Sequence, residues 1–293
     1  MDRIFRMFPA LLAAAALAAC SNATMTRLAY SNAALAYSNA GSALAWTVDD
    51  YVDMSDAQEA WVRDRASRLM DWHRREELPR ARKILEGMLA KGDKPYSAEE
   101  LAALQGDVRG FYLRVMGQLV PDMAEFLAAT DAEQLARMER KLAKDNHEFL
   151  KESVRGTPEE RRKRRVHRFI GHLEAWIGSL DDAQRQVVAS AYGEVPDFTE
   201  EMLGERRYRQ SEVIALVKSR ATKPEMEPQL RRLFVDMDAW RRPEYRDEVR
   251  ARDAKLQEAV AKISATLSAK QRAALQARIR GLIADIDKVT SAS

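Results

Sequence analysis

The sequence predicts an all-α fold, an elongated antiparallel bundle or array whose helices are kinked by proline. Charged residues make up 32% of the 293-residue chain and aromatic residues 7%, with only 12 glycines and 9 prolines. This composition is typical of helical surfaces rather than of strands and turns. Apolar residues recur at helical spacing along the chain, and no stretch alternates with period two. A chain of this length buries a sizeable core, as one elongated domain or two small ones.

Residues 1–19 have the properties of a secretory signal peptide. Arg3 and Arg6 precede an apolar run over residues 8–19, which is well short of the roughly 20 residues that a membrane-spanning helix needs. The segment Leu-Ala-Ala-Cys-Ser at residues 17–21 resembles the bacterial lipobox. The resemblance implies cleavage before Cys20 and a lipid, with acyl chains such as palmitate, on that cysteine. The alternative is a plain Ala-x-Ala cleavage site beside an incidental cysteine. Cys20 is the only cysteine, so an internal disulfide is excluded.

The residue after Cys20 and the overall charge bear on location and partners. Ser21 stands where lipoproteins of the inner membrane often carry aspartate, so the resemblance implies the outer membrane, facing the periplasm. Removal of residues 1–19, which hold Asp2, Arg3 and Arg6, takes the formal net charge from +3 to +2. With 48 basic and 45 acidic residues, the chain lacks the basic excess of a nucleic-acid binder, and we expect no nucleic-acid partner.

Residues 20–53 are expected to form the lipid-anchored segment and a first helix, ahead of a helical domain over residues 54–293. Leu-Ala-Tyr-Ser-Asn-Ala occurs at residues 28–33 and again at 35–40, a period of seven that places leucines and tyrosines along one side of a helix. Trp46, Val48 and Tyr51 continue this apolar face. We therefore expect a packed helix rather than a bare tether.

The next predicted helix contains the first candidate interaction site. Ser55 and Gln58 have the spacing of a capping box, and the helix must kink or stop at Pro79. The candidate residues are Trp72, His73, Arg75, Glu76 and Pro79. Two interpretations stay open. Either Trp72 packs in the bundle while Arg75 and Glu76 pair across helical turns, or the kink opens a recognition groove with Trp72 as an apolar wall and Arg75 as a fork for carboxylates.

Caps and loops divide the chain from residue 80 to residue 156. Gly-Asp-Lys-Pro at residues 92–95 predicts a loop. A second capping box at residues 97–100 begins a helix that Pro121 is expected to kink. Another helix is predicted to begin at Asp131 and to be closed by Gly156.

The helix that follows carries the second candidate site. Thr157 to Glu160 combine a cap, a proline at the first helical position and an acidic first turn. Apolar residues from Val166 to Leu180 make a core-facing stripe. Five cations lie in the first turns, where the helix dipole disfavours them: Arg161, Arg162, Lys163, Arg164 and Arg165. They form either a solvated face offset by Glu159 and Glu160, or a contact with an anionic surface such as phospholipid or lipopolysaccharide phosphates.

The last third of the chain is divided by prolines and ends in an amphipathic helix. Breaks are predicted near Pro196, Pro224 and Pro243. The last helix has apolar residues at i, i+4, i+7, i+8 and i+11 between Leu275 and Ile286.

One short pattern recurs at four predicted helix starts: an apolar residue or threonine, then serine or aspartate, two residues, and glutamine. It occupies residues 54–58, 130–134, 180–184 and 267–271. As an N-cap with glutamine at N3, it needs no role beyond starting helices. It also resembles the Leu-Thr-x-x-Gln motif of Spy and CpxP, helical periplasmic proteins that hold unfolded clients without ATP. The likeness covers only these windows, and the chain is about twice as long, so their dimeric cradle is not carried over.

Most of the mature chain resembles an uncharacterised family of proteobacterial lipoproteins, defined only as a domain of unknown function. The resemblance is carried by the lipobox, the Tyr- and Asn-rich segment, Trp-Thr-Val-Asp-Asp-Tyr-Val at residues 46–52 and Trp-His-Arg-Arg-Glu-Glu-Leu-Pro at residues 72–79. It implies a helical outer-membrane lipoprotein and supplies no catalytic residues.

The sequence carries no recognisable catalytic or metal-binding motif. His73 and Glu77 are four residues apart, but two ligands are too few for a structural metal site. His167 and His172 are five apart, about 140° round a helix, so they do not face one ion. Gly-x-Ser-x-Gly, His-Glu-x-x-His and phosphate-loop motifs are absent. We expect no metal, no cofactor and no enzymatic activity.

The expected function is binding in the cell envelope. The leading hypothesis is a chaperone-like or interaction role with unfolded or envelope polypeptides as partners. The alternative is a structural adaptor that contacts peptidoglycan or an outer-membrane assembly. A peptidoglycan-active enzyme would need carboxylates brought together by tertiary packing, which a chain with 45 acidic residues leaves open.

Overall fold

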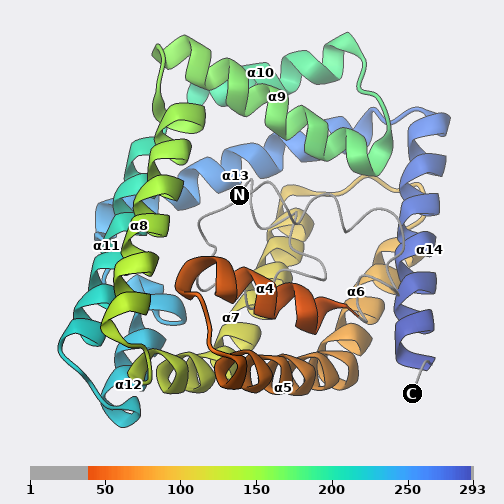
Figure 1. The fold of residues 1–293 in the computed structure, drawn as a ribbon. Helices are drawn as coiled ribbons and strands as arrows, with labels where there is room; N and C mark the ends of the chain where they lie inside the picture. Colours follow the sequence, from red (N-terminus) through yellow and green to blue (C-terminus); the bar gives the residue numbers. More distant parts are fainter. Residues whose placement is uncertain (1–38, 292–293) are drawn as a thin grey trace.

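The computed structural model describes residues 39–291, and within that range every regular element is helical (Figure 1). The predicted all-α class is therefore confirmed. The α-helices are α4 (Ala40–Val52), α5 (Asp56–Trp72), α6 (Leu78–Ala90), α7 (Ala98–Ala128), α8 (Ala132–Phe149), α9 (Pro158–Ile177), α10 (Asp182–Glu194), α11 (Thr199–Lys218), α12 (Lys223–Phe234), α13 (Pro243–Ala265) and α14 (Ala269–Ser291). Short π-helices follow α5 (His73–Glu77) and α8 (Leu150–Val154), and a 3-10 turn (Met237–Ala239) precedes α13.

Side-chain caps fix most of the helix starts, as the sequence predicts. Ser55 accepts from the Gln58 N–H at 3.3 Å, while the Gln58 side chain accepts from the Ser55 N–H at 3.0 Å. The same two-way box begins α7, α8, α9, α10 and α12. Each box satisfies N–H groups that a helix start leaves without partners.

Of the two outcomes predicted at Pro79, the structure has the kink. The chain passes from α5 to α6 without a loop, through the π-helical turn His73–Glu77. The Leu78 N–H donates to the His73 carbonyl, five residues back, and Pro79, which has no N–H, lies in the first turn of α6. The chain changes direction between α5 and α6 (Figure 1). Pro121 lies inside α7, which continues beyond it.

The helices pack in pairs that form the sides of a frame (Figure 1). One side holds α9 and α10, a second α8 and α11, and a third α6 and α14. The fourth side contains α5 and α12, and α12 packs on α7. Inside the frame, α4 lies on α5 and α8, while α13 lies between α10 and α7.

Two larger cores and a smaller one hold this frame together. The first joins α4, α5, α7, α8, α11 and α12, and α4 contributes Ala45, Val48, Tyr51 and Val52. The second joins α9, α10 and α13, and the smallest joins α6, α7 and α14. Helix α4 thus packs in the first core through Val48 and Tyr51, but the expectation for Trp46 is wrong: its side chain is 61% exposed and lies outside this core. The predicted signal peptide 1–19, Cys20 and residues 21–38 lie outside the described residues. Within residues 39–291, no helix combines the length and apolar character needed to cross a bilayer.

Candidate functional site

An apolar pocket of about 70 Å³ lies between α4, α5 and α7. Its lining is mainly aliphatic and aromatic, with one arginine and one aspartate. The lining residues are Leu44, Val48, Trp61, Val62, Arg65, Ala66, Leu69, Leu119, Asp122, Met123, Phe126 and Leu127. A concave apolar surface with a few placed polar groups is the usual form of a ligand site.

One small side chain leaves room for this pocket. Ala66 stands eleven residues after the N-cap of α5, and the equivalent positions of the other three helices with the recurring motif hold Leu142, Tyr192 and Ile279. All four side chains are buried. A Cβ added at Gly41 of α4 would lie 3.6 Å from the Ala66 Cβ, so α4 crosses α5 closely there. Alanine in this register thus allows the crossing and leaves space beside it.

The rim of the pocket is a network of charges around a tryptophan. The Arg65 guanidinium lies over the Trp61 ring, 5.0 Å from its centroid, with Nε 3.6 Å from Asp122 Oδ1 and one terminal nitrogen 3.4 Å from Glu125 Oε1. Glu125 also accepts from Lys223 Nζ at 2.6 Å and Trp61 Nε1 at 3.2 Å. The Lys223 hydrogen bond lowers the pKa of Glu125, whereas burial raises the pKa of Asp122. The rim therefore holds two cations and two carboxyl groups, whose pKa values are shifted in opposite directions.

The first predicted site is divided by the structure rather than gathered. Trp72 is half-buried against the first core, and His73 is buried. Arg75, Glu76 and Pro79 are exposed, and Glu76 pairs with Arg80 at 3.5 Å. None of these residues lines the pocket. The contacts favour the interpretation in which Trp72 packs in the bundle.

His73 and Glu77, considered as metal ligands from the sequence, lie in a buried ion-pair cluster. Glu77 is 1% exposed, and its carboxylate accepts from Arg114 at 2.7 and 2.9 Å. Burial lowers the pKa of His73 to about 4, although the Glu77 charge opposes this. The Glu77 carboxylate, which a metal ion would need as a ligand, is thus already bound by Arg114. Within residues 39–291, no group of three or more His, Cys, Asp and Glu side chains is placed to hold a metal ion.

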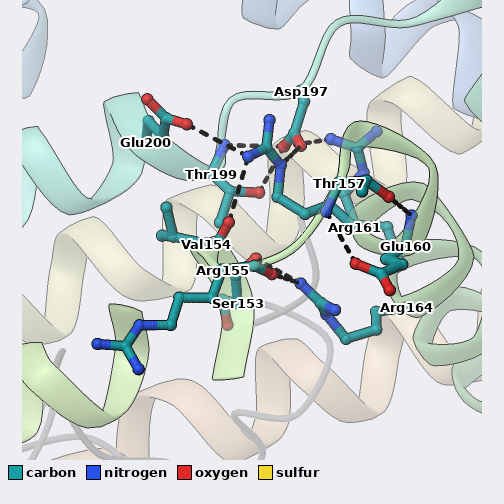
Figure 2. A network of polar contacts seen from close by, with 11 residues as sticks. Ser153, Val154, Arg155, Thr157, Glu160, Arg161, Arg164, Asp197, Thr199 and Glu200 are labelled. Carbon is teal, nitrogen blue, oxygen red and sulfur yellow. Dashed lines mark hydrogen bonds and ion pairs between the residues drawn. The ribbon is translucent and has the colours of Figure 1, made fainter. Parts of the chain in front are cut away.

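In the second predicted site, four of the five cations, Arg161, Lys163, Arg164 and Arg165, bind the protein itself. Arg161 lies 2.7 Å from Asp197 and 3.4 Å from Glu200, and donates to the Val154 carbonyl at 3.2 Å (Figure 2). Arg164 donates to the carbonyls of Ser153 and Arg155. These carbonyls end the helical segment that follows α8, and cations favour the C-terminal end of a helix. Cations that the helix dipole disfavours at the start of α9 therefore stabilise the end of the preceding helical segment, Leu150–Val154.

Asp197 joins this network to the start of α11. It accepts from the Thr199 N–H at 3.1 Å and the Thr199 hydroxyl at 2.5 Å, and it pairs with Arg161 (Figure 2). It also pairs with Arg165. Burial opposes ionisation, but the hydrogen bonds from Thr199 and Arg161 lower the pKa of Asp197. Of the predicted run, Arg162 and Lys163 stay exposed, and Lys163 pairs with Glu159 at 3.0 Å, as expected for a solvated face. Contact with an anionic surface stays a prediction, and these two cations are the ones placed to make it.

The four recurring motifs form two reciprocal pairs. Gln58 Nε2 donates to Gln134 Oε1 at 3.2 Å, and Gln134 Nε2 donates back to Gln58 Oε1 at 2.7 Å. Gln184 and Gln271 make the same exchange. The first pair joins the starts of α5 and α8, and the second joins those of α10 and α14. The motifs are therefore helix caps and also contacts between distant parts of the chain.

Sequence reasoning missed the pocket because its lining combines the consecutive helices α4 and α5 with α7, which is separated from them along the chain. The available signal was the register of the recurring motif, in which Ala66 is the one small residue at an otherwise large, buried position. Met123 and Asp122 follow Pro121 in α7 and carry no recognisable pattern of their own.

Comparison with known proteins identifies a family and no activity. No curated protein and no solved structure matches the chain. A family model described as a family of unknown function (DUF6279) matches residues 50–246, which runs from the end of α4 into α13 and includes the α5 and α7 walls of the pocket. Because this match covers more than half of the 293 residues, the chain belongs to the DUF6279 family.

Proposed function

We propose that this protein is a lipid-anchored binding protein of the outer membrane that faces the periplasm and holds polypeptide segments without catalysis. The observation that carries the proposal is the apolar pocket between α4, α5 and α7, with Arg65 and Asp122 in its wall. Buried pockets that admit an apolar side chain, surrounded by polar groups, are typical centres of protein binding. The lipobox at residues 17–21 supports attachment through Cys20.

The charge around the pocket suits a chaperone-like role. Arg65, Asp122, Glu125 and Lys223 place both signs within one short stretch of surface. Such a rim favours no strongly charged partner, because each cation is matched by a carboxylate. The apolar lining supplies the attraction, and many different polypeptides offer an apolar side chain to it.

The test uses the chain from Ser21 onward in an aggregation assay. A chemically denatured test protein is diluted with or without a several-fold excess, and light scattering is followed. The unaltered chain should suppress scattering, and Leu44→Phe, which places a ring at the pocket wall, should lose most of this effect. Leu85→Phe is the matched control, because Leu85 is also a half-buried leucine but packs against the smallest core. No suppression by the unaltered chain, or equal suppression by Leu44→Phe, would contradict the proposal.

A further inference from the structure

The size of the pocket bears on which side chain it takes. Its volume of about 70 Å³ is roughly half of the ~150 Å³ of an engineered apolar cavity that holds benzene. Branched aliphatic side chains are therefore a better match than aromatic rings. The inner lining is aliphatic near Val48, Val62 and Leu119, so the environment suits a hydrocarbon group without polar atoms.

The wall of the pocket also contains a donor without a hydrogen-bond acceptor. Arg65 Nε is buried, and none of the described residues accepts a hydrogen bond from it. Asp122 Oδ1 lies 3.6 Å away, which is longer than a hydrogen bond. A buried donor left in this state is unfavourable, and a ligand oxygen that accepts from it would remove the cost.

Asp122 supplies the complementary acceptor. It lines the same pocket from α7, while Arg65 lines it from α5. The two groups thus present one N–H donor and one carboxylate acceptor beside an aliphatic pocket. A peptide main chain has the matching pair, a carbonyl oxygen and an N–H. A fatty acid has no N–H for Asp122, so it would satisfy only one of the two groups, and the balanced charges of the rim give its carboxylate no net attraction.

We infer that the pocket recognises a peptide through one branched aliphatic side chain together with the adjoining main chain, whose carbonyl accepts from Arg65 Nε and whose N–H donates to Asp122. This inference rests on the proposed function and specifies its ligand. It makes leucine, isoleucine and valine the preferred anchors, and it makes the main-chain contacts independent of the rest of the client sequence. That combination suits a protein that holds many different polypeptides.

The test is a methyl NMR titration of the mature chain with blocked amino acids. N-acetyl-leucine N-methylamide should shift the methyl signals of Val48, Val62 and Leu119 and leave those of Val188 and Ile263, in the second core, unchanged. N-acetyl-glycine N-methylamide should cause no shift, because it has no side chain. N-acetyl-tryptophan amide and laurate should each bind at least about tenfold more weakly than the leucine probe.

Variants separate the side-chain contact from the main-chain contacts. Arg65→Lys keeps the positive charge but removes the Nε donor, and it should weaken the leucine probe about tenfold, as expected for a lost charge-assisted hydrogen bond. Arg68→Lys is the control, because Arg68 lies on the same helix, pairs with Asp64 and does not line the pocket. Unchanged binding by Arg65→Lys, or tighter binding of laurate or the tryptophan probe, would overturn the inference. If aggregation is suppressed while the leucine probe does not bind, the inference fails and the proposed function stands; if neither occurs, both fail.

Discussion

Gln184 and Gln271 exchange hydrogen bonds across the starts of two helices. Gln184 Nε2 donates to Gln271 Oε1 at 3.2 Å, and Gln271 Nε2 donates to Gln184 Oε1 at 2.8 Å. Each Oε1 also accepts from the N–H of its own N-cap, Asp181 at 3.2 Å and Ser268 at 2.9 Å. Gln271 Nε2 further donates to the Ser179 carbonyl at 2.9 Å. Both glutamines are buried, so each side chain must donate and accept at once.

Replacing one of these glutamines by glutamate should therefore destabilise the protein. Gln271→Glu has no N–H to donate to Gln184 Oε1 and places a carboxylate in a buried site. We expect the free energy of unfolding in urea to fall by about 2–4 kcal/mol. Glu100→Gln is the control, because Glu100 is the N3 residue of an exposed capping box on α7, where it also pairs with Lys91; its effect should be much smaller than that of Gln271→Glu. Equal stability of Gln271→Glu and the unaltered chain would show that the pair contributes nothing.

The capping boxes show which features of the fold can be predicted from the sequence alone. Their spacing predicts where helices begin, because the contacts are local. The N3 residue also separates two classes: glutamine stands in the paired boxes, and glutamate stands in the exposed boxes at Glu100, Glu160 and Glu225. The sequence does not show which capping boxes pair with each other, because the paired glutamines lie 76 and 87 residues apart along the chain. Pairing depends on how the helices are arranged in space, and local spacing does not encode that.

Arg161 should matter for stability, while its neighbour Arg162 should not. Arg161 joins Asp197, Glu200 and the Val154 carbonyl, so Arg161→Met leaves a partly buried carboxylate with one partner fewer. We expect a loss of about 1–3 kcal/mol in the free energy of unfolding. Arg162→Met removes the same charge from an exposed position and should change it by less than about 0.5 kcal/mol. Similar losses for both variants would mean that overall charge, rather than the network, is responsible.

The predicted basic run illustrates why candidate sites are harder to predict than folds. Helical periodicity identifies the class because each helix buries one face, and that face is local in sequence. The partners of Arg161 and Arg165 are not local: Asp197 lies 36 residues beyond Arg161. The sequence shows that cations stand at an unfavourable helix start, but it does not show the distant carboxylates and carbonyls that bind them. For the pocket, the sequence does contain a local signal: Ala66 is small, whereas the residues at the same position after the other three motifs are large.

His73 predicts a loss of stability as the solution becomes mildly acidic. Burial lowers the pKa of His73 from its ordinary value of 6.5 to about 4 in the folded protein. A group with a lowered folded pKa binds protons more readily when unfolded, so stability falls as pH drops from about 6.5 toward 4. Between pH 7 and pH 5, this group alone should lower the free energy of unfolding by about 2 kcal/mol.

The measurement is urea unfolding at the two pH values for the unaltered chain and for His73→Asn. The difference between the two pH values should shrink by about 2 kcal/mol in His73→Asn. His167→Asn is the control, because His167 is exposed on α9, and it should keep the pH dependence of the unaltered chain. If the free energy of unfolding changed with pH in His73→Asn as it does in the unaltered chain, the pH dependence would belong to other groups.

Tyr51 and Asp145 provide a further test of the core that supports the pocket. The Tyr51 hydroxyl donates to Asp145 Oδ2 at 2.5 Å, and Lys141 Nζ lies 3.5 Å from Asp145 Oδ1. Asp145 is buried, so its carboxylate oxygens rely on these partners rather than on water for hydrogen bonds. This contact fixes α4 on α8, and α4 supplies one wall of the pocket. Tyr51→Phe keeps the ring and removes the donor, and it should lower the free energy of unfolding by about 1–3 kcal/mol.

A double-mutant cycle assigns that loss to the contact itself. Asp145→Asn removes the charge that the Tyr51 hydroxyl stabilises, so Tyr51→Phe should cost less in the Asp145→Asn background than in the unaltered chain. The coupling energy from urea unfolding should exceed about 0.5 kcal/mol, as is usual for residues in direct contact. Additive losses would show that the two side chains act independently. In that case the position of α4, and with it the shape of the pocket, would depend on its other contacts, such as the apolar packing of Val48 and Val52 and the Lys141–Asp50 ion pair.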